Sequence, residues 1–154
     1  MRLRDYLSRD LVFVLHRAPS KRDFLAHVVD LVHECCPSID RDVLLNGLLE
    51  REEQVTTGIG HGVAIPHTMV PGLDRPRCVT IQTPEGQDYE ALDGSPVHLF
   101  FMLLSPPGET GTHIRLLARV ARLVDSEAFV SRVATAGSAA EVLRLTLEED
   151  ERHV

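Results

Sequence analysis

The sequence predicts an α/β fold, in which one domain contains a mixed β-sheet flanked by helices. Segments with the apolar spacing of helices alternate with short, continuous apolar segments typical of strands. No internal repeat, long linker or low-complexity segment interrupts this alternation, which favours a sheet covered by helices. The 154 residues, 44% hydrophobic and 25% charged, suffice for one domain with a substantial core. We therefore treat residues 1–154 as a single domain.

The first strand and the first helix follow from an apolar segment and a helix-capping pattern. Leu11–Leu15 is apolar throughout and predicts a short strand. Ser20, followed three residues later by Asp23, resembles a capping box and predicts a helix that runs to about Cys35. The predicted inward face of this helix consists of Phe24, Val28, Leu31 and Val32.

A second helix is predicted directly after Pro37, which cannot continue the first one. Either Ser38 or Asp40 can cap the new helix, which should end near Arg51. Its predicted inward face consists of Val43, Leu44, Leu48 and Leu49. Arg51 is thereby placed just ahead of a glycine-rich segment.

This segment, Thr56–Thr68, reads T-T-G-I-G-H-G-V-A-I-P-H-T and leads from three alternate glycines to one histidine. Glycine allows positive φ and a close approach of backbones, whereas Val63–Ile65 is typical of a buried strand. Pro66 ends that strand, so His67 is predicted at a strand end, on a rim. A dinucleotide-binding loop is excluded, because G-x-G-x-x-G needs glycine where Val63 stands and a helix directly afterwards.

Two further strands are predicted in the middle of the chain. Cys78–Gln82 is one, and Val97–Leu104 is the other. The second does not alternate between apolar and polar residues, so both of its faces should be buried. Ser105–Gly108, with two prolines and a glycine, should end it.

The last third of the chain predicts three helices. Thr112 can cap the first, and Asp125 or Ser126 can cap the second. Ser138 with Glu141 suggests a capping box for the last helix. The predicted inward face of the first of these helices consists of Ile114, Leu117, Ala118 and Ala121. The acidic residues in 148–154 are expected to form a frayed, solvated tail beyond a core of about 3–147.

Charge and hydropathy exclude several classes of partner. A formal net charge of −7 and a single lysine, Lys21, argue against nucleic acid, whose phosphates favour clustered cations. The longest apolar run, Leu99–Leu104, is far shorter than the roughly 20 residues that a membrane-spanning helix needs. Met1–Asp5 lacks the apolar core of a signal peptide. We expect no direct membrane insertion and a cytoplasmic location.

The cysteines and histidines give no sign of a cofactor or a metal site. Cys35, Cys36 and Cys78 form neither a disulfide framework nor a C-x-x-C motif, so reduced structural thiols are expected. Cys78 lies in an apolar strand pattern and is predicted to belong to the core. A motif such as H-E-x-x-H is absent from the sequence.

The glycine-rich segment and its surroundings resemble a known family. Arg51-Glu52, T-T-G-I-G at 56–60 and A-I-P-H at 64–67 are similar to the signature of the EIIA domains of the bacterial phosphoenolpyruvate-dependent sugar phosphotransferase system, fructose/mannitol class. The similarity continues in D-G-S-P-V at 93–97 and in H-I-R-L-L-A at 113–118, and it covers roughly residues 3–147. It implies the same layered α/β fold.

The resemblance also implies a function and a set of site residues. In this class the A-I-P-H histidine takes phosphate from the phosphocarrier HPr and passes it to a cysteine of an EIIB domain, which makes His67 the expected phosphoryl acceptor. A neutral imidazole suits this role, because its pKa of about 6.5 leaves a free lone pair near neutral pH. By position, His113 would be a second active-site histidine that stabilises phosphate, Arg51 would supply a cation, and Thr57 would donate a hydrogen bond to the phosphate or the imidazole.

The sequence leaves two other functions open. A metal-dependent hydrolase could use His61, His67 and His113, although no carboxylate has a recognisable ligand spacing. The second alternative is the family's nitrogen-regulatory branch, in which phosphorylation controls binding to regulatory proteins. The sequence also leaves homodimerisation open, and it does not decide whether Ile59, Val63 and Val70 form an apolar docking rim around His67 or belong to the core.

Overall fold

The computed structural model describes residues 1–153 and contains a mixed six-stranded sheet, which confirms the predicted fold class. Its strands are β1 (Val12–Val14), β2 (Gly58–Gly60), β3 (Val63–Ala64), β4 (His67–Met69), β5 (Arg77–Gln87) and β6 (Val97–Ser105). The order across the sheet is β1-β5-β6-β3-β2, and β4 also pairs with β6. Strands β3 and β4 run parallel to β6, whereas β5 is antiparallel to it.

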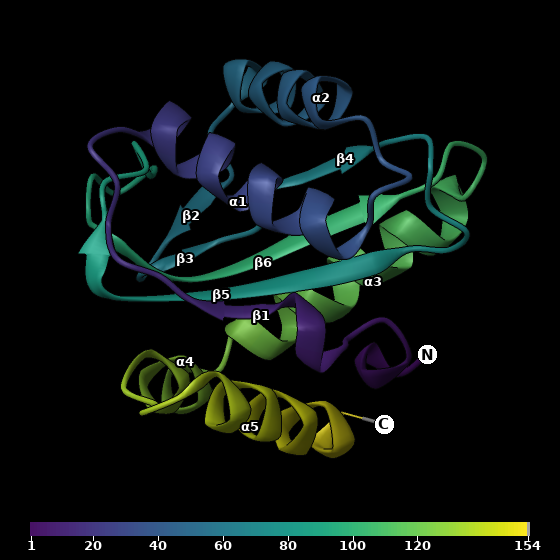
Figure 1. The fold of residues 1–154 in the computed structure, drawn as a ribbon. Helices are drawn as coiled ribbons and strands as arrows, with labels where there is room; N and C mark the ends of the chain where they lie inside the picture. Colours follow the sequence, from purple (N-terminus) through teal and green to yellow (C-terminus); the bar gives the residue numbers. More distant parts are fainter. Residues whose placement is uncertain (154) are drawn as a thin grey trace.

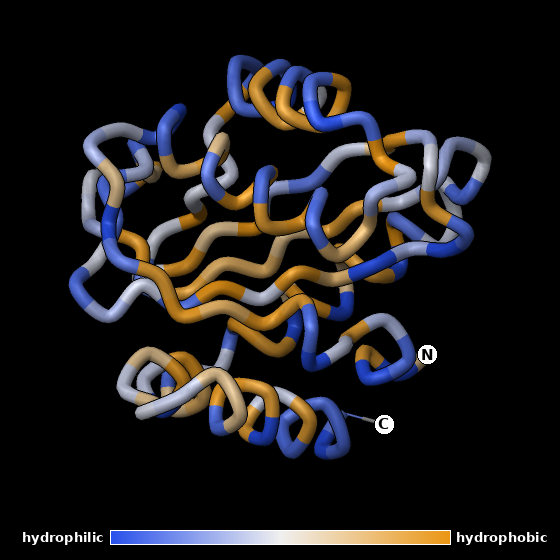
Figure 2. Tube along the Cα trace, viewed as in Figure 1, coloured by the Kyte–Doolittle hydropathy of each residue, from blue (hydrophilic) through white to orange (hydrophobic). Residues whose placement is uncertain are grey.

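Helices cover both faces of this sheet (Figure 1). The helices are α1 (Lys21–Cys35), α2 (Arg41–Gln54), α3 (Thr110–Val124), α4 (Glu127–Ala134) and α5 (Ala139–Arg152), with short 3-10 turns η1 (Leu3–Asp5) and η2 (Arg9–Leu11). Helices α1 and α2 lie over one face, and α3, α4 and α5 lie over the other. The strands between them are largely apolar (Figure 2), so the sheet separates two hydrophobic cores.

The central strand β6 serves both cores, as its continuous apolar sequence predicts. Leu103 packs in the core beneath α3, whereas Leu104 packs in the core beneath α1 and α2. This alternation follows from the strand geometry, in which successive side chains point to opposite faces. Cys78, paired with Leu103, is completely buried, which confirms its predicted place in the core. Burial raises the pKa of the Cys78 thiol to about 12.

Most helices begin where the sequence predicts. The side chains of Ser20, Asp40, Ser126 and Ser138 each accept a hydrogen bond from a backbone N–H of the first turn. Helix α3 differs, because it begins at Thr110 after an N-cap at Glu109, and Thr112 lies inside its first turn. Helix α2 runs to Gln54, so Arg51 lies in its last turn.

The predicted inward face of α2 is partly wrong, and that of α3 is largely wrong, because of its four predicted residues Leu117 alone is partly buried. Val43 on α2 is 47% exposed. On α3, Ile114 is 60% exposed, and the buried positions are His113, Leu116, Val120 and Leu123. Apolar residues surround most of the α3 axis, so the sequence permits more than one inward stripe. The stripe that is buried contains a histidine, which the hydrophobic pattern alone did not select.

The expectation of a solvated acidic tail is also wrong for part of residues 148–154. Helix α5 continues to Arg152, Glu149 is 5% exposed, and Asp150 is completely buried. Asp150 forms an ion pair of 2.8 Å with Arg119 of α3, which compensates the buried carboxylate. Arg119 lies 31 positions earlier in the chain, so local composition could not reveal this pairing.

Within residues 1–153, no helix combines the length and the hydropathy that crossing a membrane requires.

Candidate functional site

His67 is oriented by the break that Pro66 makes between β3 and β4. Proline has no N–H to donate, and the two strands continue along the same neighbour, β6, on either side of it. Beside this break, the carbonyl oxygen of Ile65 accepts a hydrogen bond of 2.9 Å from Nδ1 of His67. A carbonyl can only accept, so Nδ1 carries the proton and Nε2 carries the lone pair of the neutral ring.

Arg51 lies directly at that free nitrogen. Its Nε donates to Nε2 of His67 over 3.1 Å, and its Nη1 donates to the carbonyl oxygen of Val55 at the end of α2 over 2.8 Å. Helix α2 can approach β4 closely because it carries Gly47, where a Cβ would lie only 2.7 Å from Oγ1 of Thr68. The same close approach brings Arg51, one turn further along α2, to the imidazole.

His67 is held in its neutral form. Burial lowers the pKa of its imidazole below the ordinary value of 6.5, and the nearby Arg51 cation lowers this pKa further. The hydrogen bond to Ile65 acts in the opposite direction but does not cancel these effects. The ring therefore keeps its lone pair at neutral pH.

His113 reaches the same place from the opposite layer. It lies in the first turn of α3, is 7% exposed, and its ring centroid is 5.6 Å from that of His67. Its Nδ1 is 2.7 Å from the hydroxyl oxygen of Ser105, the last residue of β6. Burial, and then the proximity of His67, lower the pKa of His113, so two neutral imidazoles face each other.

Arg51, His67 and His113 line one surface hollow of about 560 Å³ between α2, β4 and the start of α3. Its other lining residues are Val43, Asn46, Gly47, Glu50, Gln54, Thr68 and Met69. The three residues come from three separate elements, and the structure brings all of them together. A small anion that entered this hollow would meet a guanidinium and two imidazole rings.

Thr57 has a different place from the one expected. Its hydroxyl donates to Oε2 of Glu52, and its N–H donates to Oε1 of the same carboxylate over 2.9 Å. Lys21 forms an ion pair of 2.9 Å with Glu52 and lies over the ring of the buried Tyr89. Among the described residues, Thr57 makes no hydrogen bond to His67, and it instead fixes the loop against the end of α2, next to Arg51.

The three residues considered for an apolar rim divide into two groups. Val63 and Val70 are buried in the two cores, whereas Ile59 is 45% exposed on β2. Val63 and Val70 therefore belong to the core rather than to a docking rim.

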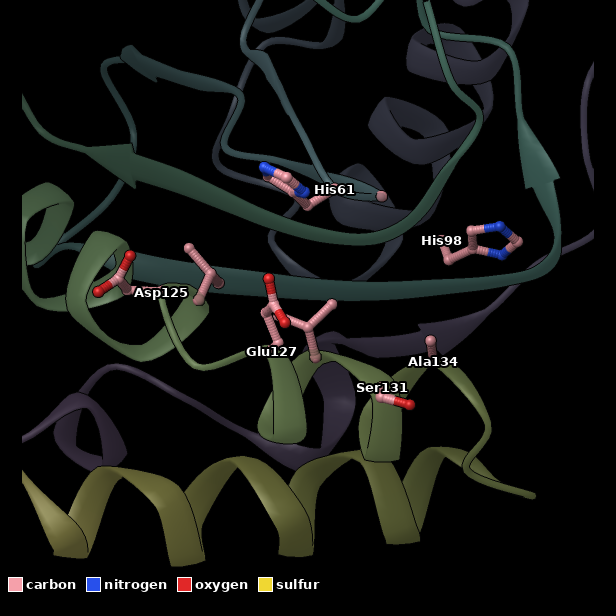
Figure 3. Close-up of a pocket in the computed structure, with 9 residues that line it drawn as sticks. His61, His98, Asp125, Glu127, Ser131 and Ala134 are labelled. Carbon is pink, nitrogen blue, oxygen red and sulfur yellow. The ribbon is translucent and has the colours of Figure 1, made fainter. Parts of the chain in front are cut away.

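His61 lies in a second hollow of about 430 Å³, lined also by His98, Asp125 and Glu127 (Figure 3). In Figure 3 these side chains come from the β2–β3 turn, the start of β6 and the α3–α4 region. The metal-hydrolase alternative requires His61 to lie with His67 and His113. The structure places His61 in a different hollow, which argues against that alternative. In the part of the chain that the structure describes, no group of three or more His, Cys, Asp or Glu residues is placed to hold a metal ion.

Sequence reasoning missed two contributors to the site. Ser105 was assigned only to the end of a strand, although it is a polar residue at the close of an apolar run. Lys21 was used only for the charge argument, and no local sequence pattern links it to Glu52. Ser105 lies 8 positions before its partner His113, and Lys21 lies 31 positions before its partner Glu52.

The mixed sheet, its two helical layers and the two neighbouring histidines beside Arg51 define an α/β domain with a two-histidine site. Residues 5–149 match the family model described as "Phosphoenolpyruvate-dependent sugar phosphotransferase system, EIIA 2". The chain belongs to this EIIA family.

Individual relatives carry both transport and regulatory names. The chain is 32% identical over 129 residues to a nitrogen regulatory protein of Pseudomonas aeruginosa, with 84% of each chain covered. It is 32% identical over 113 residues to the fructose-specific EIIA component of Haloferax volcanii, with 73% of each covered. The crystal structure of the nitrogen regulatory protein IIA-Ntr from Neisseria meningitidis superposes with a TM-score of 0.82 at 30% identity, covering 92% of this chain and 97% of that one.

Proposed function

We propose that Nε2 of His67 accepts a phosphoryl group from an HPr-type phosphocarrier and passes it to a cysteine of an EIIB domain. One observation carries this proposal: the Nδ1–H group of His67 is committed to the carbonyl oxygen of Ile65. The opposite nitrogen, Nε2, then has the free lone pair in a hollow open to a partner.

The chemistry needs no general base at His67. As the new P–Nε2 bond forms, the bond between phosphorus and the donor atom of the phosphocarrier breaks, and the bonding electrons leave with that donor atom. Charge in the transition state accumulates on the equatorial oxygens, so the protein contributes alignment and hydrogen-bond donors. In the onward step the cysteine attacks as its thiolate, the P–Nε2 bond breaks while a P–S bond forms, and Nε2 recovers its lone pair.

Arg51 has two successive roles in this scheme. Before transfer its Nε donates to the same lone pair that must attack phosphorus, so the guanidinium has to leave Nε2 as phosphorus approaches. It can then donate to the phosphoryl oxygens, where its permanent charge is most useful. His113, which lines the same hollow, supplies a second donor to these oxygens.

A second function uses the same site as a switch. The names of the P. aeruginosa and N. meningitidis proteins favour a regulatory role, in which phosphorylation of His67 controls binding to a protein partner. A phosphoryl group would add a doubly negative charge to a hollow whose charged lining residues are Arg51 and Glu50, which changes the charge of that surface.

Phosphorylation with phosphoenolpyruvate, Enzyme I and HPr tests the acceptor. We expect one acid-labile, base-stable phosphate per chain, lost in His67→Ala and retained in the matched control His61→Ala, whose side chain lines the other hollow. In His113→Ala the phosphate should form more slowly or hydrolyse faster. Full labelling of His67→Ala would reject the assignment.

Arg51→Met and onward transfer complete the test. The Arg51 variant should lose about 1.5–3 kcal/mol of transition-state stabilisation, or roughly 10–150-fold in transfer rate. Phosphorylated protein is then mixed with EIIB domains. Loss of label to an EIIB cysteine supports the transport role, whereas stable label and phosphorylation-dependent capture of a regulatory protein support the switch.

A further inference from the structure

Ser105 is a buried hydroxyl at the end of the otherwise apolar strand β6. Its side chain is inaccessible to solvent, and its oxygen lies 2.7 Å from Nδ1 of His113. Within residues 1–153 this is the one hydrogen bond made by the Ser105 hydroxyl. The mechanism proposed above does not use Ser105, so its polarity in this position calls for a separate explanation.

We propose that Ser105 is a positioning residue that fixes the tautomer of His113, with Nδ1 as the acceptor and the proton on Nε2. This inference rests on the proposed function, in which His113 donates to the phosphoryl group on His67. If Nδ1 carried the proton instead, the buried hydroxyl hydrogen of Ser105 would have no acceptor. Donation from Ser105 to Nδ1 satisfies both buried groups.

The tautomer decides what His113 presents to an anion. A neutral imidazole has one N–H donor and one lone pair, and the two tautomers exchange these positions. With Nδ1 occupied by Ser105, Nε2 is the nitrogen left for the hollow that His113 shares with His67. The proposed tautomer directs a donor toward phosphoryl oxygens, whereas the other would direct a lone pair at them and repel them.

The sheet places acceptor and positioning residue in a fixed relation. In the register of β4 and β6, His67 is opposite Leu103 and Met69 is opposite Ser105. Residues two apart on a strand share a face, so Ser105 and His67 extend toward the layer that contains α3. Both groups are therefore held by the same pair of hydrogen-bonded strands, next to the first turn of α3.

The direct test is the tautomer of His113, read from the ¹⁵N chemical shifts of its ring in the unphosphorylated protein at neutral pH. The wild type should show the Nε2–H tautomer alone, and Ser105→Ala should show a mixture of both. Ser105→Thr is the matched control, because it keeps the hydroxyl and should keep the wild-type tautomer. An Nδ1–H tautomer in the wild type, or an unchanged tautomer in Ser105→Ala, would overturn the proposal.

A kinetic measurement connects the tautomer to phosphate stabilisation. Phospho-His67 should hydrolyse about five- to tenfold faster in Ser105→Ala and within about twofold of wild type in Ser105→Thr. Ser105→Cys, with a weakly donating thiol, should be intermediate and replaces the alanine variant if that variant fails to fold. The tautomer is measured on unphosphorylated protein, so absence of phosphate labelling in the wild type would contradict only the proposed function. Normal labelling of Ser105→Ala, with a wild-type rate of phospho-His67 hydrolysis, would contradict the positioning role of Ser105.

Discussion

Replacing Asp150 by Asn should destabilise the domain far more than replacing its neighbour Glu151 by Gln. Both substitutions remove one negative charge at adjacent positions of α5. Asp150 is completely buried and accepts from Arg119 over 2.8 Å and from the N–H of Arg4 over 3.3 Å. Glu151 lies at the surface, where 47% of its side chain is exposed, and pairs with Arg2 at 2.9 Å.

The burial of the two groups gives the expected magnitudes. Asp150→Asn leaves the Arg119 guanidinium, whose side chain is 9% exposed, without its counter-charge. Breaking a buried pair on one side costs about 3–5 kcal/mol. Arg119 also donates to the backbone oxygens of Asp150 and His153, which persist, so we expect the lower end, about 3 kcal/mol. Exposed pairs such as that of Glu151 are worth roughly 0.2–1 kcal/mol.

Thermal unfolding followed by circular dichroism distinguishes the two variants. In a domain of this length 1 kcal/mol corresponds to about 2–4 °C, so Asp150→Asn should lower Tm by about 6–12 °C and Glu151→Gln by at most about 4 °C. Salt at about 0.5 M should remove most of the Glu151 effect by screening and leave most of the Asp150 effect. Equal shifts in the two variants would refute the burial of Asp150 in a packed ion pair.

Three further predictions concern the turns, the acid side of the pH range and the loop beside the site. Gly72→Ala should lower the free energy of unfolding in urea by more than about 2 kcal/mol, because Gly72 has φ +104° and a Cβ there would lie 2.3 Å from the carbonyl oxygen of Ser38. The control Gly94→Ala should lower it by only about 1 kcal/mol, because Gly94 has φ +71° and nothing lies within 4 Å of its Cβ position. A larger loss in Gly94→Ala than in Gly72→Ala would contradict this packing. The His67 imidazole should titrate by NMR with a pKa below 6.5, because burial and Arg51 lower that pKa. As pH falls below 6.5 the unfolded chain binds the proton first, so His67 contributes a loss of folding stability that grows until the pH reaches its pKa in the folded protein. An NMR titration midpoint above 6.5 would be inconsistent with this environment. Thr57→Val should lower the free energy of unfolding by about 1–3 kcal/mol, because it removes the hydroxyl that donates to Glu52, and it should slow phosphorylation less than Arg51→Met does. Thr57→Ser keeps the hydroxyl and should be close to wild type. A transfer defect in Thr57→Val as large as that of Arg51→Met, without loss of stability, would indicate direct contact of Thr57 with phosphate instead.

Local patterns predicted the architecture well because they act over a few residues. The caps at Ser20 and Ser138 depend on side chains that bond to backbone groups three positions away, and the structure contains both. Pro66 was predicted to end a strand and to leave His67 at that strand's end; β3 does end before Pro66, but His67 is the first residue of a further strand, β4, which pairs with β6. The family resemblance then added His113 and Arg51, which the structure places around the same hollow.

Predictions failed where a residue's environment depends on a partner that the local sequence pattern does not specify. The inward face of α3 includes His113, which contacts Ser105 and the ring of His67. The helical periodicity of α3 does not predict these contacts. Asp150 is buried because Arg119 compensates it across two helices. Thr57 donates to Glu52 at the end of α2 and not to the imidazole, a pairing that the glycine motif does not specify; its predicted hydrogen bond to phosphate stays a prediction.

The pairing of Lys21 with Glu52 has a practical consequence for finding the partners of this protein. Lys21 is the sole lysine, and only 12% of its side chain is accessible. Amine-reactive cross-linkers and amine-coupled sensor surfaces therefore have almost no accessible amine to react with apart from the α-amino group. A failure to capture a complex with these reagents would not show that the complex is absent. The exposed thiol of Cys35, at the far end of α1 and outside the hollow of His67, is the better point of attachment.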